Sequence, residues 1–265
     1  MKSKVITEKR SDCISLSNGK FTLKLPLNAY VPWHVDWFDY IFETFQDKDG
    51  MIDISSPALV KIRKTGEEFF VIQAPEDIGM EGYLKINPPN KNSVVFDVGA
   101  NVGFTVCRYA KMCKRVIAFE PNSSSFKALS RNVELHDLRN VLLVLAGIWS
   151  ETKDSEITTN LGGGDALKEY AGRHKTEKVR VFNLEDAIKM TRKPTHIKMD
   201  IERAELDVIA GNLDYIAQND FKFAIACYHV VAGDTTANRL VKMFNSIGYK
   251  TELVYPEHLT LHAWR

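Results

Sequence analysis

The sequence lacks the features that tie a chain to a membrane or to a polyanion. No apolar run approaches the roughly 18 residues that span a bilayer, and residues 1–10 contain no apolar core of a signal peptide. A formal net charge of +1 provides no basic footprint for nucleic acid or for an anionic membrane. These absences predict a globular, cytoplasmic protein with no nucleic-acid partner and no membrane partner.

Cysteine is also scarce. The 265 residues contain four, at Cys13, Cys107, Cys113 and Cys227. They form no Cys-x-x-Cys pair and no zinc-like spacing with histidine. We therefore expect reduced, mostly buried thiols.

The most informative segment is 94–103, an apolar run that ends at Asp97 and is followed by Gly99 and Gly103. A strand that delivers a carboxylate, then a glycine turn, to a helix N-terminus is typical of nucleotide-type cofactor sites. Glycine lets the backbone approach such a ligand closely. A second expected strand, 115–119, ends at Glu120, where a carboxylate can accept both hydroxyls of a ribose.

Two features favour S-adenosylmethionine over NAD at this site. Asn101 stands where a dinucleotide fingerprint has its middle glycine. Asp97 would repel a pyrophosphate but would pair with the ammonium group of a methionine moiety. The alternative is a tight strand-to-helix turn that holds no ligand.

From residue 94 onward, strand-like and helix-like segments alternate, which predicts a mostly parallel sheet with helices on both faces. The expected strands are 94–98, 115–119, 141–147, 195–200, 222–228, 251–255 and 260–264, with a further extended segment at 179–184. The expected helices are 103–113, 122–136, 185–191, 204–218 and 235–247. The last two strands are too close for a parallel crossover, so one should run antiparallel. The fold class is therefore α/β, a Rossmann-like, seven-stranded, mostly parallel sheet with one antiparallel strand.

Residues 1–90 are expected to form an N-terminal α+β extension on a main domain at 91–265. Its expected strands are 20–25, 59–63 and 69–73. An aromatic, helix-like segment at 33–45 contains Trp33, Trp37, Phe38, Tyr40, Phe42 and Phe45. Such a stripe forms core packing or lines a substrate pocket. The run 162–164 of three glycines marks a loop at about 150–178, of the kind that often binds ligands.

A second group of polar residues follows the strand at 195–200. Asp200 ends that strand at the edge where parallel sheets bind ligands, so we expect it near the cofactor. Glu202 and Glu205 begin the next helix, where they could also serve as helix-start charges. His229, delivered with Tyr228 by the next strand, is a candidate general base or a backbone cap. The candidate catalytic residues are Asp200, His229 and Glu202. These acids and His229 could instead hold a divalent ion, but the sequence alone assigns no metal site.

Three blocks resemble the FkbM family of S-adenosylmethionine-dependent methyltransferases, namely residues 96–104, 118–121 and 197–205; Gly248-Tyr249 also fits. By position, the resemblance implies that the methionine end is held by Asp97, Gly99, Asn101 and Gly103, the ribose by Glu120 with Pro121 and Asn122 beside it, and the adenine near Ala146 and Gly147, with Asp200 facing the transferred methyl. The chain departs from the family pattern at Arg203, where the family has glycine, and at Cys227, where it often has glutamate.

These observations predict O-methylation of a small-molecule or carbohydrate-like acceptor with S-adenosylmethionine as cofactor. One alternative is a methyltransferase that acts on nitrogen or on a protein. The other is a non-catalytic cofactor-binding or scaffold protein on the same fold, which the substitutions at Arg203 and Cys227 keep open. The identity of the acceptor and the oligomeric state have no readable code in the sequence.

Overall fold

The computed structural model describes residues 4–27, 35–36, 38–72, 81–158, 176–231, 233–254 and 259–265. The glycine run at 162–164 and two of the aromatic residues, Trp33 and Trp37, lie outside the described residues.

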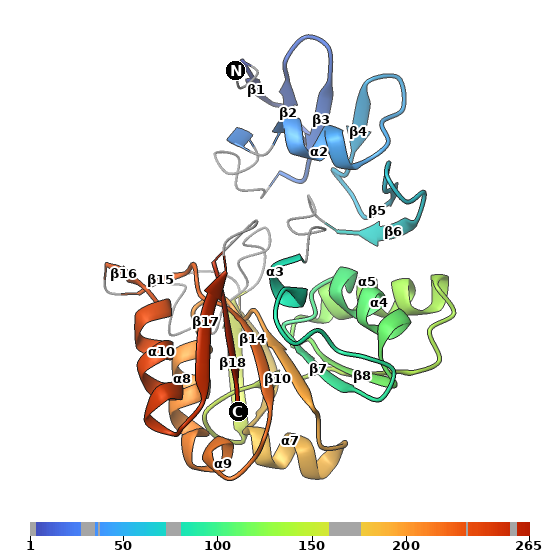
Figure 1. Cartoon of the computed structure of the whole chain (residues 1–265). Coiled ribbons are helices and arrows are strands. Elements are labelled where there is room, and N and C mark those ends of the chain that lie inside the picture. The colour runs from blue at the N-terminus through green and yellow to red at the C-terminus, as the bar shows by residue number, and fades with distance from the viewer. Residues whose placement is uncertain are drawn as a thin grey trace.

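A seven-stranded sheet forms the centre of the main domain, in the order β17-β18-β14-β13-β7-β8-β9 (Figure 1). Its strands are β7 (Val94–Val98), β8 (Arg115–Phe119), β9 (Val141–Val144), β13 (His196–Met199), β14 (Lys222–Ala226), β17 (Lys250–Val254) and β18 (Thr260–Trp264). The five strands from β14 to β9 pair in parallel, and β18 pairs antiparallel with both of its neighbours. The predicted sheet, with its single antiparallel strand, is confirmed.

Helices cover both faces of this sheet, with α4 (Phe104–Met112) and α5 (Ser123–Leu135) on one side and α8 (Glu205–Gly211) and α10 (Ala237–Ser246) on the other (Figure 1). Alternate residues of a strand point to opposite faces. In β7, Val95 packs in the core under α4, whereas Phe96 and Val98 pack in the core under α8 and α10. Because both faces are covered, all five residues of β7 are buried.

The expected helix at 204–218 is two helices, α8 and α9 (Leu213–Ala217). Asn212 lies between them and is buried. Its side-chain nitrogen donates to the carbonyls of Trp149 and Val208, and its oxygen accepts the N–H of Leu184 at the start of α7 (Leu184–Met190). These side-chain hydrogen bonds to the backbone compete with a continuous helix.

The expected strand at 141–147 is also interrupted. β9 ends at Val144, and β10 (Gly147–Ile148) joins a separate small sheet with β12 (Thr176–Phe182) and β11 (Lys153–Thr158). A short hairpin of β15 (Val230–Val231) and β16 (Asp234–Thr235) follows β14. Both features depend on pairing between distant or very short segments, which periodicity does not reveal.

The N-terminal part contains a four-stranded sheet and a two-stranded sheet at one end of the molecule (Figure 1). Its elements are β1 (Ile6–Lys9), β2 (Ile14–Ser17), β3 (Thr22–Leu25), α2 (Phe38–Thr44), β4 (Met51–Asp53), β5 (Ala58–Lys61) and β6 (Glu68–Val71), and α3 (Glu81–Leu84) leads to the main sheet. Phe38, Phe42 and Phe45 are buried in its core, together with Cys107 of α4. Core packing is therefore the role of these three aromatic side chains.

The contact between the two parts includes a buried amide. The side-chain oxygen of Asn132, on α5, accepts the N–H of Phe70, and its nitrogen donates to the carbonyls of Phe70 and Val102. Asn132 thus joins strand β6 to the glycine turn that precedes α4.

The four cysteines are free and buried, as predicted. None of the helices in the described part of the chain combines the length and the apolar character needed to cross a bilayer.

Candidate functional site

The glycine turn after β7 leads directly to the N-terminus of α4. Gly103 occupies the N-cap position with φ 97° and provides no side-chain cap to the first N–H groups of the helix. Asn101 adopts φ 48°, a left-handed conformation that asparagine tolerates better than most residues. Backbone N–H groups at an uncapped helix N-terminus are suited to an anionic group such as a carboxylate.

Glu120 follows β8 and fixes two backbone segments with one carboxylate. Its Oε2 accepts the N–H of Asn101 at 2.8 Å, and its Oε1 accepts the N–H of Asn122 at 2.8 Å. The Asn122 side chain caps α5 by accepting the N–H groups of Ser124 and Ser125. The structure thus brings Glu120 against the glycine turn, and it gives the side chain of Asn122 a helix-capping role; that Glu120 holds a ribose stays a prediction.

The residues predicted to lie near the adenine are also adjacent to this segment. Gly147 lies against Pro121: a Cβ atom built at residue 147 would be 3.8 Å from the Cβ and Cγ atoms of Pro121. Ala146 is buried directly before it. The two predicted groups, residues 120–122 and 146–147, therefore form one neighbourhood.

Asp97 is fully buried and paired with a lysine that the sequence analysis did not single out. The Nζ atom of Lys198, on β13, lies 3.1 Å from Oδ1 of Asp97 and donates to the carbonyl oxygen of Gly99 at 2.8 Å. Burial raises the pKa of Asp97, and Lys198 acts in the opposite direction. Lys198 lies opposite Asp97 because β13 and β7 pair in register. The sequence feature that could have identified Lys198 is its position, because it is a charged residue inside an otherwise apolar strand.

The segment after β13 abuts the glycine turn. Gly99 has φ 78°, and a Cβ built there would lie 1.8 Å from the carbonyl oxygen of Asp200. The glycine at position 99 is therefore required by the close approach of the chain at residue 200. This approach places the polar residues after β13 beside the turn that precedes α4.

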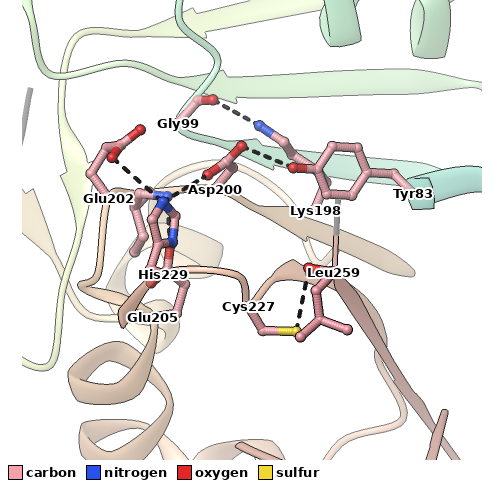
Figure 2. A network of polar contacts seen from close by, with 10 residues as sticks. Tyr83, Gly99, Lys198, Asp200, Glu202, Glu205, Cys227, His229 and Leu259 are labelled. Atoms are coloured by element: carbon pink, nitrogen blue, oxygen red, sulfur yellow. Dashed lines mark hydrogen bonds and ion pairs between the residues drawn. The ribbon is translucent and has the colours of Figure 1, made fainter. Parts of the chain in front are cut away.

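Four titratable side chains gather at this point (Figure 2). Nε2 of His229 lies 3.4 Å from Oε2 of Glu202 and 3.9 Å from Oδ1 of Asp200, and its Nδ1 lies 3.3 Å from Oε1 of Glu205. Glu205 also accepts the N–H of Ile201 at 2.9 Å. The three predicted catalytic residues, Asp200, Glu202 and His229, are thus brought together, and Glu205 joins them.

The surroundings of His229 act on its pKa in two directions. Burial lowers its pKa, but the hydrogen-bonding contacts with Glu202 and Glu205 and the charge of Asp200 outweigh burial and raise the pKa to about 11. The pKa of Glu202 is raised, chiefly by burial and against the effect of His229. At neutral pH these surroundings favour an imidazolium. A general base must be neutral before it accepts a proton, so these carboxylates act against that role, and the catalytic role of His229 stays a prediction.

Tyr83 of α3 is a further residue that sequence reasoning missed. Its hydroxyl donates to Oδ2 of Asp200 at 2.9 Å (Figure 2), and the Nζ atom of Lys198 lies 5.5 Å from its ring centre. No motif marks this tyrosine, because it reaches Asp200 from 117 residues away in the sequence.

Arg203 and Cys227, the two positions at which the sequence departs from the FkbM pattern, lie in different surroundings. Arg203 is exposed and adopts φ 83°, directly after Glu202 at φ 56°, so two consecutive non-glycine residues are left-handed. Such conformations cost on the order of 1 kcal/mol each and concentrate at functional sites. Cys227 is buried, and its Sγ donates to the carbonyl of Leu259 at 3.4 Å. Burial raises its pKa to about 12, so this thiol is not a nucleophile.

The molecule has the fold of a class I methyltransferase: a seven-stranded Rossmann-like sheet, a glycine turn at an uncapped helix, an acid near the end of β7 and an acid directly after β8. The chain belongs to the methyltransferase FkbM domain family, which it matches over residues 97–251. Methyltransferases of this family use S-adenosylmethionine, the cofactor that the sequence predicts. The donor set fits that cofactor, since it includes N–H groups at the N-terminus of α4 and an acid, Glu120, that the backbone holds in place.

Two relatives show the extent of the similarity. "Methyltransferase 1" of Beauveria bassiana (strain ARSEF 2860) is 25% identical over 164 residues, which are 51% of this chain and 65% of the relative. The crystal structure of methyltransferase FkbM from Methylobacillus flagellatus KT is similar in fold, with a TM-score of 0.50 and 19% identity, over 68% of this chain and 45% of that chain. The chain thus spans less than two thirds of the length of either protein.

Proposed function

We propose that the protein transfers a methyl group from S-adenosylmethionine to a hydroxyl oxygen of a small-molecule or carbohydrate-like acceptor. The observation that supports this most directly is the contact between the two halves of the site. Because Asp200 packs against Gly99, the carboxylate cluster lies beside the turn that would hold the methionine end of the cofactor.

The residues of this chain supply binding and alignment. N–H groups at the N-terminus of α4 would hold the carboxylate of the methionine moiety. Glu120 would hold the ribose hydroxyls, and residues 146–147 would lie near the adenine. When bound, S-adenosylmethionine supplies an electrophilic methyl group on a sulfonium. Holding the acceptor oxygen in line with that methyl converts an encounter into an intramolecular step, which can lower the barrier substantially.

The ammonium of the methionine moiety has a competitor in this structure. Asp97 already forms an ion pair with Lys198, so its carboxylate has a cationic partner even when no cofactor is bound. We propose that Asp97 acts by holding Lys198, which in turn holds the carbonyl of Gly99. In this arrangement the main role of Asp97 is to hold the glycine turn in place through Lys198, and not to bind the ammonium group of the cofactor.

Asp200 is the catalytic candidate that its surroundings favour. The side chains of Asp200 and Glu202 are 21% and 27% exposed, whereas those of Glu205 and His229 are buried. Of the two partly exposed acids, Asp200 is the one whose backbone abuts Gly99 of the glycine turn. An ionised carboxylate here would accept a hydrogen bond from the acceptor hydroxyl and take its proton as methylation proceeds. His229, which lies between the three carboxylates, would hold them in place.

A radiochemical assay tests this function. The protein would be incubated with methyl-labelled S-adenosylmethionine and a panel of sugars, glycosides and other small hydroxyl compounds, with proteins and amines as separate arms. The proposal predicts label in a hydroxyl compound and loss of most transfer in Asp200→Asn, with Asp207→Asn, an exposed acid on α8, as the control. Label only in amines or proteins would favour the alternative methyltransferase. Cofactor binding without transfer to any acceptor would favour the scaffold.

A further inference from the structure

The carboxylate cluster contains more negative charge than its surroundings offset. Three carboxylates, those of Asp200, Glu202 and Glu205, lie within 3.9 Å of the ring nitrogens of a single imidazole, His229. The nearby cation Lys198 is committed to Asp97. Charges removed from water are costly unless they are fully compensated. A ligand of double positive charge would offset the excess.

We propose that Asp200, Glu205 and His229 form a binding site for one divalent metal ion. One ligand atom from each residue, two carboxylate oxygens and an imidazole nitrogen, lies within 4.8 Å of the other two. Asp200 and Glu205 come from the connection between β13 and α8, and His229 comes from the turn after β14, so two segments that follow neighbouring strands converge on one point (Figure 2). The close contact of these segments holds the three side chains together before any ion binds.

A second observation supports a ligand at this point. Glu205 is fully buried, yet its Oε2 has no hydrogen-bond partner within the described part of the chain. A buried carboxylate oxygen without a donor is costly. Its other oxygen, Oε1, already contacts the N–H of Ile201 and Nδ1 of His229. A metal ion coordinated at this carboxylate would compensate the charge that these contacts leave.

The donor set indicates the kind of ion. An imidazole nitrogen with two carboxylate oxygens suits Mn²⁺, Fe²⁺ or Zn²⁺ better than Mg²⁺ or Ca²⁺, which prefer oxygen ligands alone. Only a neutral imidazole can coordinate, so binding of the ion would release a proton from His229 to solvent. Asp200 is the partly exposed ligand, and it lies on the side of the glycine turn. If the proposed function holds, on which this role rests, an ion there would bind the acceptor hydroxyl and lower its pKa. With the ion bound, Asp200 would act as its ligand and not as the base.

Binding of Mn²⁺ to the full chain, stripped of metal with a chelator and free of cofactor, tests the site by electron paramagnetic resonance. The site predicts one saturable ion per chain, and competition by Zn²⁺. Glu205→Gln keeps the shape of the side chain and should weaken binding at least about tenfold. If Glu205→Gln fails to fold, Asp200→Asn tests the site instead, because Asp200 is partly exposed; it should weaken binding by a similar factor. Asp207→Asn removes a charge two residues from Glu205 on the same helix and should leave affinity unchanged.

The outcomes separate this inference from the proposed function. No saturable Mn²⁺ binding, or binding that Glu205→Gln and Asp200→Asn leave unchanged, would overturn the metal site even if methyl transfer is observed. One tightly bound ion that depends on these residues would establish the site even if no hydroxyl acceptor is methylated.

Discussion

The close approach of Asp200 to Gly99 predicts a large and specific effect of Gly99→Ala. Two costs add at this position. An alanine at φ 78° is strained by about 1–2 kcal/mol. Its Cβ would also lie 1.8 Å from the carbonyl oxygen of Asp200, so the backbone must move, and overpacking of this kind costs about 1–3 kcal/mol. The free energy of unfolding should therefore fall by roughly 2–5 kcal/mol.

Gly248→Ala is the matched control, because Gly248 has φ 80° and a Cβ there would meet nothing within 4 Å. It should lose only the strain of about 1–2 kcal/mol. Urea unfolding of the wild type and both variants measures the difference. Gly99→Ala should also weaken S-adenosylhomocysteine binding, measured by calorimetry, whereas Gly248→Ala should not. Equal losses of stability in the two variants would refute the argument that residue 200 requires glycine at position 99.

Three further substitutions test other parts of the structure. Arg203→Gly should raise the free energy of unfolding by up to about 1 kcal/mol, because it relieves the strain at φ 83°, while Arg203→Ala should not. Urea unfolding measures both variants, and an equal gain in stability in the two would contradict this reasoning. Asn132→Ala should cost about 2–4 kcal/mol by the same measurement, since it leaves the partners of a buried amide unpaired, and a loss below 1 kcal/mol would contradict the assigned role. Burial and the nearby charge of Lys222 lower the pKa of His196 to about 4. Its unfolded-state pKa is near 6.5, so the unfolded chain binds the proton more tightly and stability should fall by roughly 3 kcal/mol between pH 7 and pH 4. His196→Gln should flatten that slope in unfolding experiments run across this range, and an unchanged slope would assign it to other groups.

Much of the central sheet could be predicted because its signals are local. Apolar strands that end in Asp97 and Glu120, each followed by an amphipathic helix, establish parallel pairing without knowledge of distant contacts. The short separation of the last two strands was enough to predict that one is antiparallel. The division of one helix at Asn212 could not be predicted, because the partners of its side chain are far away in the sequence.

The sequence predicts which residues form the site, but it does not predict their charge states. Position alone placed Asp200, Glu202 and His229 at the same edge of the sheet. Whether His229 is a base depends on how many carboxylates surround it, and that number is set by how the connection between β13 and α8 packs against the segment after β14. Likewise, Lys198 and Tyr83 contact Asp97 and Asp200 only through the fold.

Calorimetric titration with S-adenosylhomocysteine tests the central claim most directly, which is that the turn after β7 and Glu120 together hold the cofactor. Glu120→Gln keeps the shape of the side chain but removes the charge, and Glu134→Gln, an exposed acid on α5, is its control. The account predicts binding by the wild type and by Glu134→Gln, and an affinity at least about tenfold lower in Glu120→Gln, as expected when a charged hydrogen-bond acceptor is removed. Folded wild type that does not bind, or equal affinity in Glu120→Gln, would contradict it.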